Sequence, residues 1–290
     1  MDVACHIGAH CTDEQRLLKS LNRNRDRLSA GGIAVPVPEH YRGVLSDLIT
    51  RLRGAPPEPG VEDALIESML DGRDARRLVL SNESFICRPD RAVGEGRLYP
   101  RMHKAGWIRA AFGQCRVSFH LALRNPATLI PALAEKAGMR DPLDLLDGQD
   151  PAALRWSDAV ARLRAACPDS PITVWCNEDA PLIWPAVIRD VAGLAPEAPV
   201  RGAFDMLRGI MSNEGMRRLR GYTNARPPAS DAQQRRVAAA FLDKFALEDE
   251  VEVAIDLPGW TPALVEGMTR SYEEDLHRIA AVPDVRVIVP

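Results

Sequence analysis

Short apolar runs alternate along the chain with longer stretches in which apolar residues recur every three or four positions. The apolar runs predict buried strands at residues 3–8, 77–81, 115–123, 171–176 and 285–289. The stretches with helical spacing predict helices at residues 13–30, 40–53, 61–70, 102–112, 126–137, 157–166, 182–191, 203–219, 231–245 and 262–280. Residues 54–60 read as a turn, and residues 82–100 as irregular structure.

This alternation predicts an α/β fold of three layers (αβα), in which helices cover both faces of a mostly parallel central sheet. We expect a single domain over residues 1–290, with a helical C-terminal portion from about residue 200. In such sheets, ligands bind beyond the carboxyl ends of the strands. The turns after Gly8, Ser81 and Leu123 are therefore the places where chemistry is expected.

The turn after the first strand combines a glycine with the start of a helix. Thr12 stands three residues before Gln15, the spacing of a capping box that satisfies free N–H groups of the helix. Gly31 and Gly32 end the same helix. Because backbone N–H groups and the helix dipole both attract negative charge, the turn favours an anion such as phosphate or sulfate. The strict P-loop pattern G-x-x-x-x-G-K-[ST] is absent.

Composition narrows the function classes. Hydrophobic residues make up 46% and charged residues 27%, which is typical of a globular protein. The 37 basic and 40 acidic side chains give a net charge of −3, which argues against a basic nucleic-acid coat. Aromatic residues are only 5%, which argues against a stacking platform for single strands. We therefore expect no nucleic-acid partner, and the oligomeric state is left open.

The cysteines and the N-terminal segment indicate the cellular compartment of the protein. None of the six cysteines forms a C-x-x-C pair, and a chain of this size needs no disulfides, so we expect reduced thiols. The N-terminus shows no basic segment followed by an apolar run, and no apolar stretch has the length of a membrane span. These features predict a cytoplasmic protein that does not bind membranes.

The first turn resembles that of a bacterial sulfotransferase-like family, whose chains open with a strand followed by I-G-A-H-K-T-G-T-T. The matching residues are Ile7, Gly8, Ala9, His10 and Thr12. Similarity continues through the segment 21–36, with its Leu-Asn-Arg-Asn-Arg-Asp-Arg-Leu run, and through the C-terminal residues 272–290. The resemblance thus spans most of the chain.

Two further segments match the family in order and spacing. Arg124 and Pro126 follow the third predicted strand and fit the family's Arg-x-Pro. Glu83, Ser84 and Phe85 follow the second predicted strand and are similar to its strand-end S-E-x-F. Both segments lie at turns where the sheet topology predicts a ligand.

The resemblance implies a P-loop sulfotransferase type of fold and transfer of a sulfuryl group from PAPS to a hydroxyl of a small molecule or glycan, with PAP leaving. Arg124 would hold the 3′-phosphate, and Glu83 would deprotonate the acceptor as a general base. The residues implied in donor binding are Gly8, Ala9, His10, Cys11, Thr12, Asp13, Glu14, Gln15 and Arg124. No metal is implied.

The chain departs from the family where the donor would be most strongly held. Cys11 replaces the loop lysine, which would neutralise charge during transfer, and the loss of one such group typically lowers the rate by ~10²–10³. Asp13 and Glu14 bring negative charge to the helix N-terminus. None of the four lysines of the chain lies in this loop. We therefore expect weakened PAPS binding, and the alternative function is a catalytically inactive binding or interaction protein with the same scaffold.

Other interpretations stay open for these residues. The loop, Arg124 and Glu83 are also compatible with an ordinary capped turn, an ion pair and a solvated side chain. His10 and Cys11 could supply two zinc ligands, and Cys11 beside a helix N-terminus could be a reactive thiol. Arg217, Arg218 and Arg220 most simply form a solvated basic helix face.

One further possibility is open for the function. No Ser-His-Asp or Cys-His set can be assigned from the sequence, because such sets are defined by geometry. A third function, an accessory protein of a glycosyltransferase pathway for surface polysaccharide, rests on analogy alone.

Overall fold

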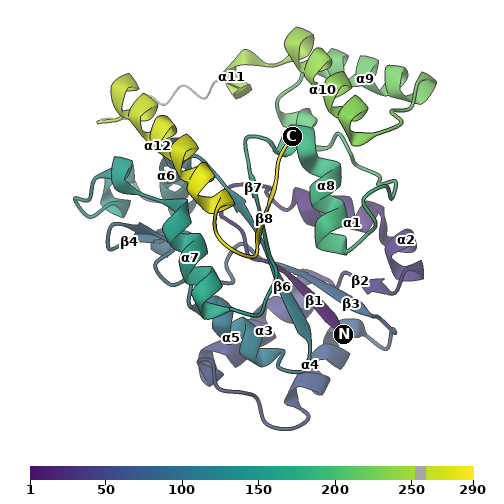
Figure 1. Ribbon diagram of the computed structural model, residues 1–290, viewed down its shortest axis with the longest axis vertical. Coiled ribbons are helices and arrows are strands. Elements are labelled where there is room, and N and C mark those ends of the chain that lie inside the picture. The colour runs from purple at the N-terminus through teal and green to yellow at the C-terminus, as the bar shows by residue number, and fades with distance from the viewer. Residues whose placement is uncertain (252–258) are drawn as a thin grey trace.

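The computed structural model describes residues 1–251 and 259–290, and it is an α/β fold of three layers (Figure 1). The central sheet has six strands in the order β2-β3-β1-β6-β7-β8, and all of its strand pairs are parallel. Its strands are β1 (Asp2–His6), β2 (Ile33–Ala34), β3 (Arg77–Ser81), β6 (Arg116–Leu123), β7 (Ile172–Cys176) and β8 (Val285–Ile288). The predicted three-layer fold with a mostly parallel sheet is confirmed.

Two groups of helices cover the sheet. One face carries α1 (Arg16–Arg23), α2 (Arg25–Ala30) and α8 (Ala180–Ala192). The other face carries α3 (Pro38–Leu52), α4 (Val61–Leu70), α5 (Lys104–Ala111), α6 (Pro126–Ala137), α7 (Trp156–Ala166) and α12 (Pro262–Ala280). Along β1, Val3 and Cys5 pack toward the second group and Ala4 toward the first. This alternation, with both faces buried, is what a central parallel strand requires.

The remaining elements lie outside these layers. The helices α9 (Asn213–Ala225) and α10 (Asp231–Phe245) pack on each other in a small apolar cluster of their own. They lie beyond the carboxyl edge of the sheet, next to the short α11 (Glu248–Val251) (Figure 1). Residues 82–100, expected to be irregular, include the two-stranded ribbon β4 (Val93–Gly94) and β5 (Arg97–Leu98). Four short 3-10 helices lie at Pro89–Arg91, Pro142–Leu145, Pro151–Ala153 and Met206–Gly209. The expectation of a single domain stays a prediction.

Two predicted helices differ from the structure. The first was expected over residues 13–30, but α1 begins at Arg16 and a break at Asn24 separates it from α2. The Asn24 side chain donates to the carbonyls of Ser20 and Arg201 and so replaces helical hydrogen bonds at the break. The helix expected over residues 203–219 begins instead at Asn213, because the Ser212 hydroxyl accepts the N–H of Gly215 and caps it there.

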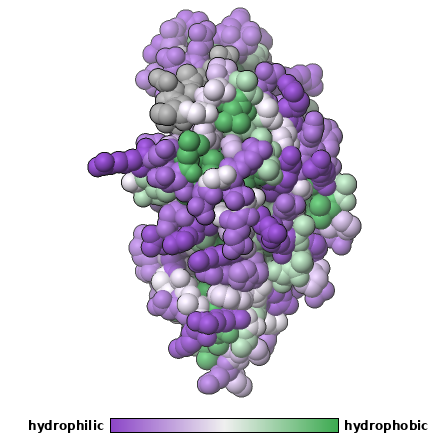
Figure 2. All heavy atoms as spheres, turned by 90° about the vertical axis from the view of Figure 1, so that its left-hand side faces the viewer, coloured by the Kyte–Doolittle hydropathy of each residue, from purple (hydrophilic) through white to green (hydrophobic). Residues whose placement is uncertain are grey.

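One face of the molecule is mostly polar (Figure 2). Figure 2 shows a predominantly hydrophilic face on which hydrophobic side chains form small, separate patches. All six cysteines are free. Within the part of the chain that the structure describes, no helix combines the length and the apolar character needed to cross a membrane.

Candidate functional site

The sheet topology brings the three predicted segments together. The strands β3, β1 and β6 are neighbours, so the turns that follow them meet at the middle of the carboxyl edge. This is where the chain crosses from one side of β1 to the other, the position at which open parallel sheets bind ligands. The residues 8–15, Glu83 and Arg124 therefore lie in one place, as the sequence predicted.

The first residues after β1 continue its backbone hydrogen bonding to β6. The N–H groups of Ile7 and Ala9 donate to carbonyls of β6, and the Gly8 carbonyl accepts the N–H of Ala122 at 2.8 Å. Gly8 has a φ of 110°, and a side chain there would meet the backbone of Glu83 at 3.4 Å. Glycine is thus required both by the backbone conformation and by the close approach of the neighbouring turn.

His10 is part of the buried framework. Its N–H donates to the Tyr99 hydroxyl at 2.8 Å, and that hydroxyl lies 2.8 Å from its Nδ1. The His10 Nε2 lies 3.4 Å from the Ser84 hydroxyl, and the two rings of His10 and Tyr99 are stacked. Burial lowers the pKa of His10 to about 4, so the imidazole is neutral near pH 7. Its contacts are those of a structural histidine.

Asp13 occupies the N-terminus of α1. Its side-chain carboxylate accepts the N–H of Leu17 at 2.9 Å, and its carbonyl accepts the N–H of Arg16 at 2.7 Å. Asp13 is only 8% exposed. The predicted capping box is wrong, because the Thr12 hydroxyl donates to the Ala9 carbonyl instead of accepting an N–H of the helix. The carboxylate therefore supplies the negative charge that an anionic ligand would bring to this helix end.

The last two loop residues face outward. Glu14 and Gln15 are exposed, and Glu14 lies 3.7 Å from the guanidinium of Arg16. Cys11, Glu14 and Gln15 all have positive φ values, which are uncommon for residues other than glycine. Among the described residues, no hydrogen-bond acceptor within the chain is found for the N–H groups of Cys11, Asp13, Glu14 and Gln15. These N–H groups remain available to water or to a ligand.

The Arg124 side chain is hydrogen-bonded to the loop after β1. Its Nη1 donates to the Cys11 carbonyl at 2.6 Å, and its Nε donates to the Thr128 hydroxyl at 3.0 Å. The Arg124 carbonyl in turn accepts the indole N–H of Trp156 at 2.8 Å. The side chain predicted to hold a 3′-phosphate thus ties the first loop to the start of α6.

Glu83 is paired with a residue that the sequence did not indicate. The carboxylate of Glu83 forms an ion pair with Lys136, at the end of α6. Lys136 also lowers the pKa of Cys11, although burial, the larger effect, raises it. The structure therefore places a lysine close to the loop that lacks one in sequence. Nothing in the sequence pattern marks Lys136, because its approach depends on how α6 packs.

The thiol and metal interpretations find no support in the geometry. The Cys11 Sγ lies 3.5 Å from the Ala132 carbonyl, and burial raises its pKa, which makes the thiolate scarce at neutral pH. In residues 1–251 and 259–290, His, Cys, Asp and Glu side chains form no group of three or more suited to a metal ion. His10 and Cys11 thus have no further ligand of these types in that part of the chain.

Comparison of the chain with protein-family models, with curated proteins and with solved structures finds no match. The resemblance to sulfotransferases thus stays a hypothesis that rests on the residues named above.

Proposed function

We propose that the protein is a binding or interaction protein with a sulfotransferase-type scaffold, and that it does not transfer sulfuryl groups. The observation that carries this proposal is the hydrogen bond from the Leu17 N–H to the Asp13 carboxylate at 2.9 Å. A buried carboxylate at this point repels a sulfate or phosphate and takes over its role at the helix dipole.

Two further contacts support the same conclusion. The guanidinium of Arg124 already donates to Cys11 and Thr128, so fewer of its five N–H groups are free to bind a phosphate. The carboxylate of Glu83 forms an ion pair with Lys136, and an acceptor hydroxyl would have to compete with the ammonium group for it. Donor binding and proton abstraction are therefore both opposed by contacts within the chain.

The second candidate is a PAPS-dependent sulfotransferase, favoured by one specific observation. The loop has N–H groups without an acceptor at Cys11 and Asp13, and Lys136, which pairs with Glu83 and acts electrostatically on Cys11, would be the missing cation. In this case PAPS would displace the Asp13 and Glu83 side chains, and Glu83 would accept the proton of the acceptor.

Calorimetric titration of the wild-type protein with PAP separates the two candidates. We expect no heat of binding up to millimolar PAP. Micromolar binding that is lost in Arg124→Ala would overturn the proposal and support the sulfotransferase. The matched control is Arg220→Ala, a change on the exposed side of α9, remote from the loop in sequence.

A further inference from the structure

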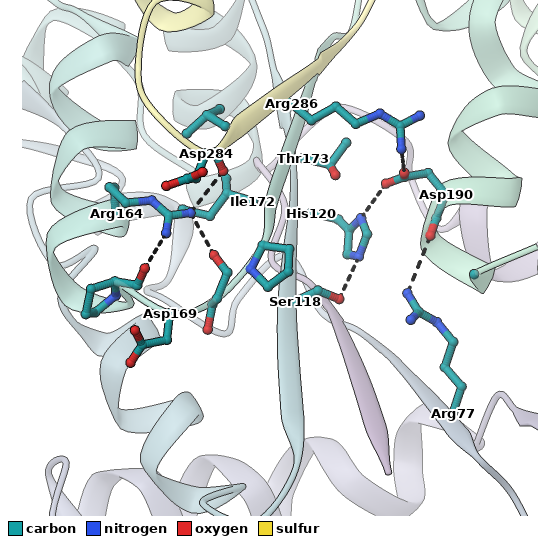
Figure 3. Close-up of a pocket in the computed structure, with 15 residues that line it drawn as sticks. Arg77, Ser118, His120, Arg164, Asp169, Ile172, Thr173, Asp190, Asp284 and Arg286 are labelled. Carbon is teal, nitrogen blue, oxygen red and sulfur yellow. Dashed lines mark hydrogen bonds and ion pairs between the residues drawn. The ribbon is translucent and has the colours of Figure 1, made fainter.

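A cavity of about 700 Å³ lies at the amino edge of the sheet, opposite the first loop (Figure 3). Its lining includes the first residues of β3, β7 and β8, and Ser118 near the start of β6. Ser118 and His120 lie in the middle of the cavity (Figure 3). On one side of them are Arg77, Asp190 and Arg286. On the other side are Arg164, Asp169 and Asp284.

Three of these side chains form a continuous line. The Ser118 Oγ lies 3.2 Å from the His120 Nε2, and the His120 Nδ1 lies 3.1 Å from the Asp190 Oδ2. Ser118 and His120 are two apart on β6 and therefore share one face of the sheet, while Asp190 comes from the end of α8. A serine, a histidine and an aspartate in this order, at these distances, define a nucleophile, its base and the group that orients the base.

The charge states suit these roles. Burial lowers the pKa of His120, so its imidazole is neutral near pH 7 and can accept a proton. For Asp190, burial alone would raise the pKa, but contacts with His120 and Arg286 outweigh it and the pKa is lowered. The ionised Asp190 is also held by an ion pair with Arg286. The carboxylate can therefore stabilise an imidazolium formed during a reaction.

Buried polar atoms without a hydrogen-bond partner concentrate in this cavity. Of six such side-chain atoms in the described residues, four belong to residues that line it. Two of them, the His120 Nδ1 and the Asp190 Oδ2, lie 3.1 Å apart, within ion-pair distance but without the alignment of a hydrogen bond. The other two are the Nε of Arg164 and the Oγ of Ser170, a residue only 2% exposed. Such unpaired buried polar atoms are rare, and they lie behind the surface of the cavity, in the residues that form its wall.

We propose that Ser118, His120 and Asp190 form a second site, which hydrolyses small carboxylic esters that carry a negative charge. The Ser118 Oγ attacks the ester carbonyl while its proton passes to the His120 Nε2. The C–O bond to the alcohol then breaks, and that proton leaves with the alcohol. Water adds to the acyl-serine in the same way, releasing the acid and restoring the serine.

Arg164 determines the charge of the substrate. Its two terminal nitrogens donate only to backbone carbonyls, those of Cys167, Pro168, Ser170 and Asp284. No carboxylate of the described residues forms an ion pair with it. Its positive charge thus has no directly paired carboxylate, and it favours a negatively charged substrate through long-range attraction. This site is independent of the function proposed for the first loop.

The test measures hydrolysis of 4-nitrophenyl hemisuccinate and 4-nitrophenyl acetate, with labelling by a fluorophosphonate. We expect hydrolysis by the wild type, preference for the charged ester by about tenfold, and one phosphonyl group on the peptide that contains Ser118. Ser118→Ala and His120→Gln should each lower the rate by about 10³-fold, and Ser118→Ala should abolish labelling. The control Ser68→Ala, an exposed serine bonded only to the Leu65 carbonyl of its own helix, should match the wild type.

The proposal is overturned if the wild type neither hydrolyses an ester nor takes up the label, or if Ser118→Ala retains both. Equal rates on the two esters would overturn the role assigned to Arg164. Thermal unfolding of each variant identifies any loss of activity that is due to misfolding. The labelled residue of the wild type shows without any variant whether Ser118 is the nucleophile.

Discussion

The Asp13 carboxylate accepts the N–H of Leu17 at 2.9 Å, inside the loop where the sequence places an anion site. A side chain of the protein thus satisfies the helix end that a phosphate or sulfate would otherwise occupy. The loop has three residues with positive φ and carries its own negative charge at the helix end.

Replacement of Asp13 tests its capping role. Asp13→Ala removes the acceptor of the Leu17 N–H and should lower the free energy of unfolding by about 1–2 kcal/mol. Asp13→Asn keeps an oxygen acceptor and should retain most of the stability. Urea unfolding of the three proteins gives the comparison, and equal stability of wild type and Asp13→Ala would show that the carboxylate does not cap α1.

Stability should fall on mild acidification. Burial lowers the pKa values of His6, His10 and His120 below 6.5, that of His10 to about 4. Below about pH 6.5 the unfolded chain binds protons that the folded chain does not, so the free energy of unfolding decreases as the pH falls. Each histidine contributes up to ~1.4 kcal/mol per pH unit until its folded pKa is reached.

The raised pKa values of the Glu178 and Asp179 carboxyls, due mainly to burial, act in the opposite direction and reduce the net slope. Urea unfolding at pH 7.5 and pH 5.5 measures the effect, and His10→Gln should show a smaller difference between the two. Stability that is constant or higher at pH 5.5 would contradict the burial of neutral histidines.

The thiols should react slowly in the folded protein. Burial raises the pKa of all six cysteines, including Cys11 in the loop. At pH 7.5 we expect Ellman's reagent to react at least roughly tenfold more slowly than with free cysteine, and all six thiols to react after denaturation. One rapidly reacting thiol that maps to Cys11 would instead support the reactive-thiol interpretation.

Two glycines of α9 form a matched pair. A Cβ at Gly215 would lie 2.4 Å from the Cβ of Phe245, whereas a Cβ at Gly221 meets nothing within 4 Å. Gly215→Ala should destabilise the packing of α9 on α10 by about 1–3 kcal/mol. Gly221→Ala should stabilise the helix by about 0.5–1 kcal/mol, because alanine is the better helix former. Hydrogen exchange of α9 and α10 measures both, and similar effects of the two changes would contradict the contact.

The fold could be predicted from the sequence wherever one periodicity dominates. The prediction gives the same bounds as the structure for β3, α4, α6, α10 and α12. In these segments the sequence shows either a strand-like apolar run or a helical spacing of apolar residues, but not both. The start of α1 could not be predicted. Thr12 and Gln15 have the spacing of a capping box, but Asp13 makes the capping bond and Gln15 adopts a left-handed φ of 64°.

The candidate site could be predicted in its position but not in its contacts. Parallel topology alone places the first loop, Glu83 and Arg124 at one edge. By contrast, the contact of Lys136 with Glu83 joins residues 53 apart and depends on the packing of α6. Likewise, Ser118 and His120 share a face by strand alternation, but nothing in the sequence indicates that Asp190 completes the line.

Restoration of the loop tests the central claim most directly. The variant Cys11→Lys with Asp13→Gly and Glu14→Thr removes both carboxylates and supplies the lysine. Calorimetric titration with PAP should then show binding at least about tenfold tighter than that of the wild type, equivalent to ~1.4 kcal/mol. A folded variant that binds PAP no better than the wild type would contradict the claim that the charge of Asp13 and Glu14 closes this site.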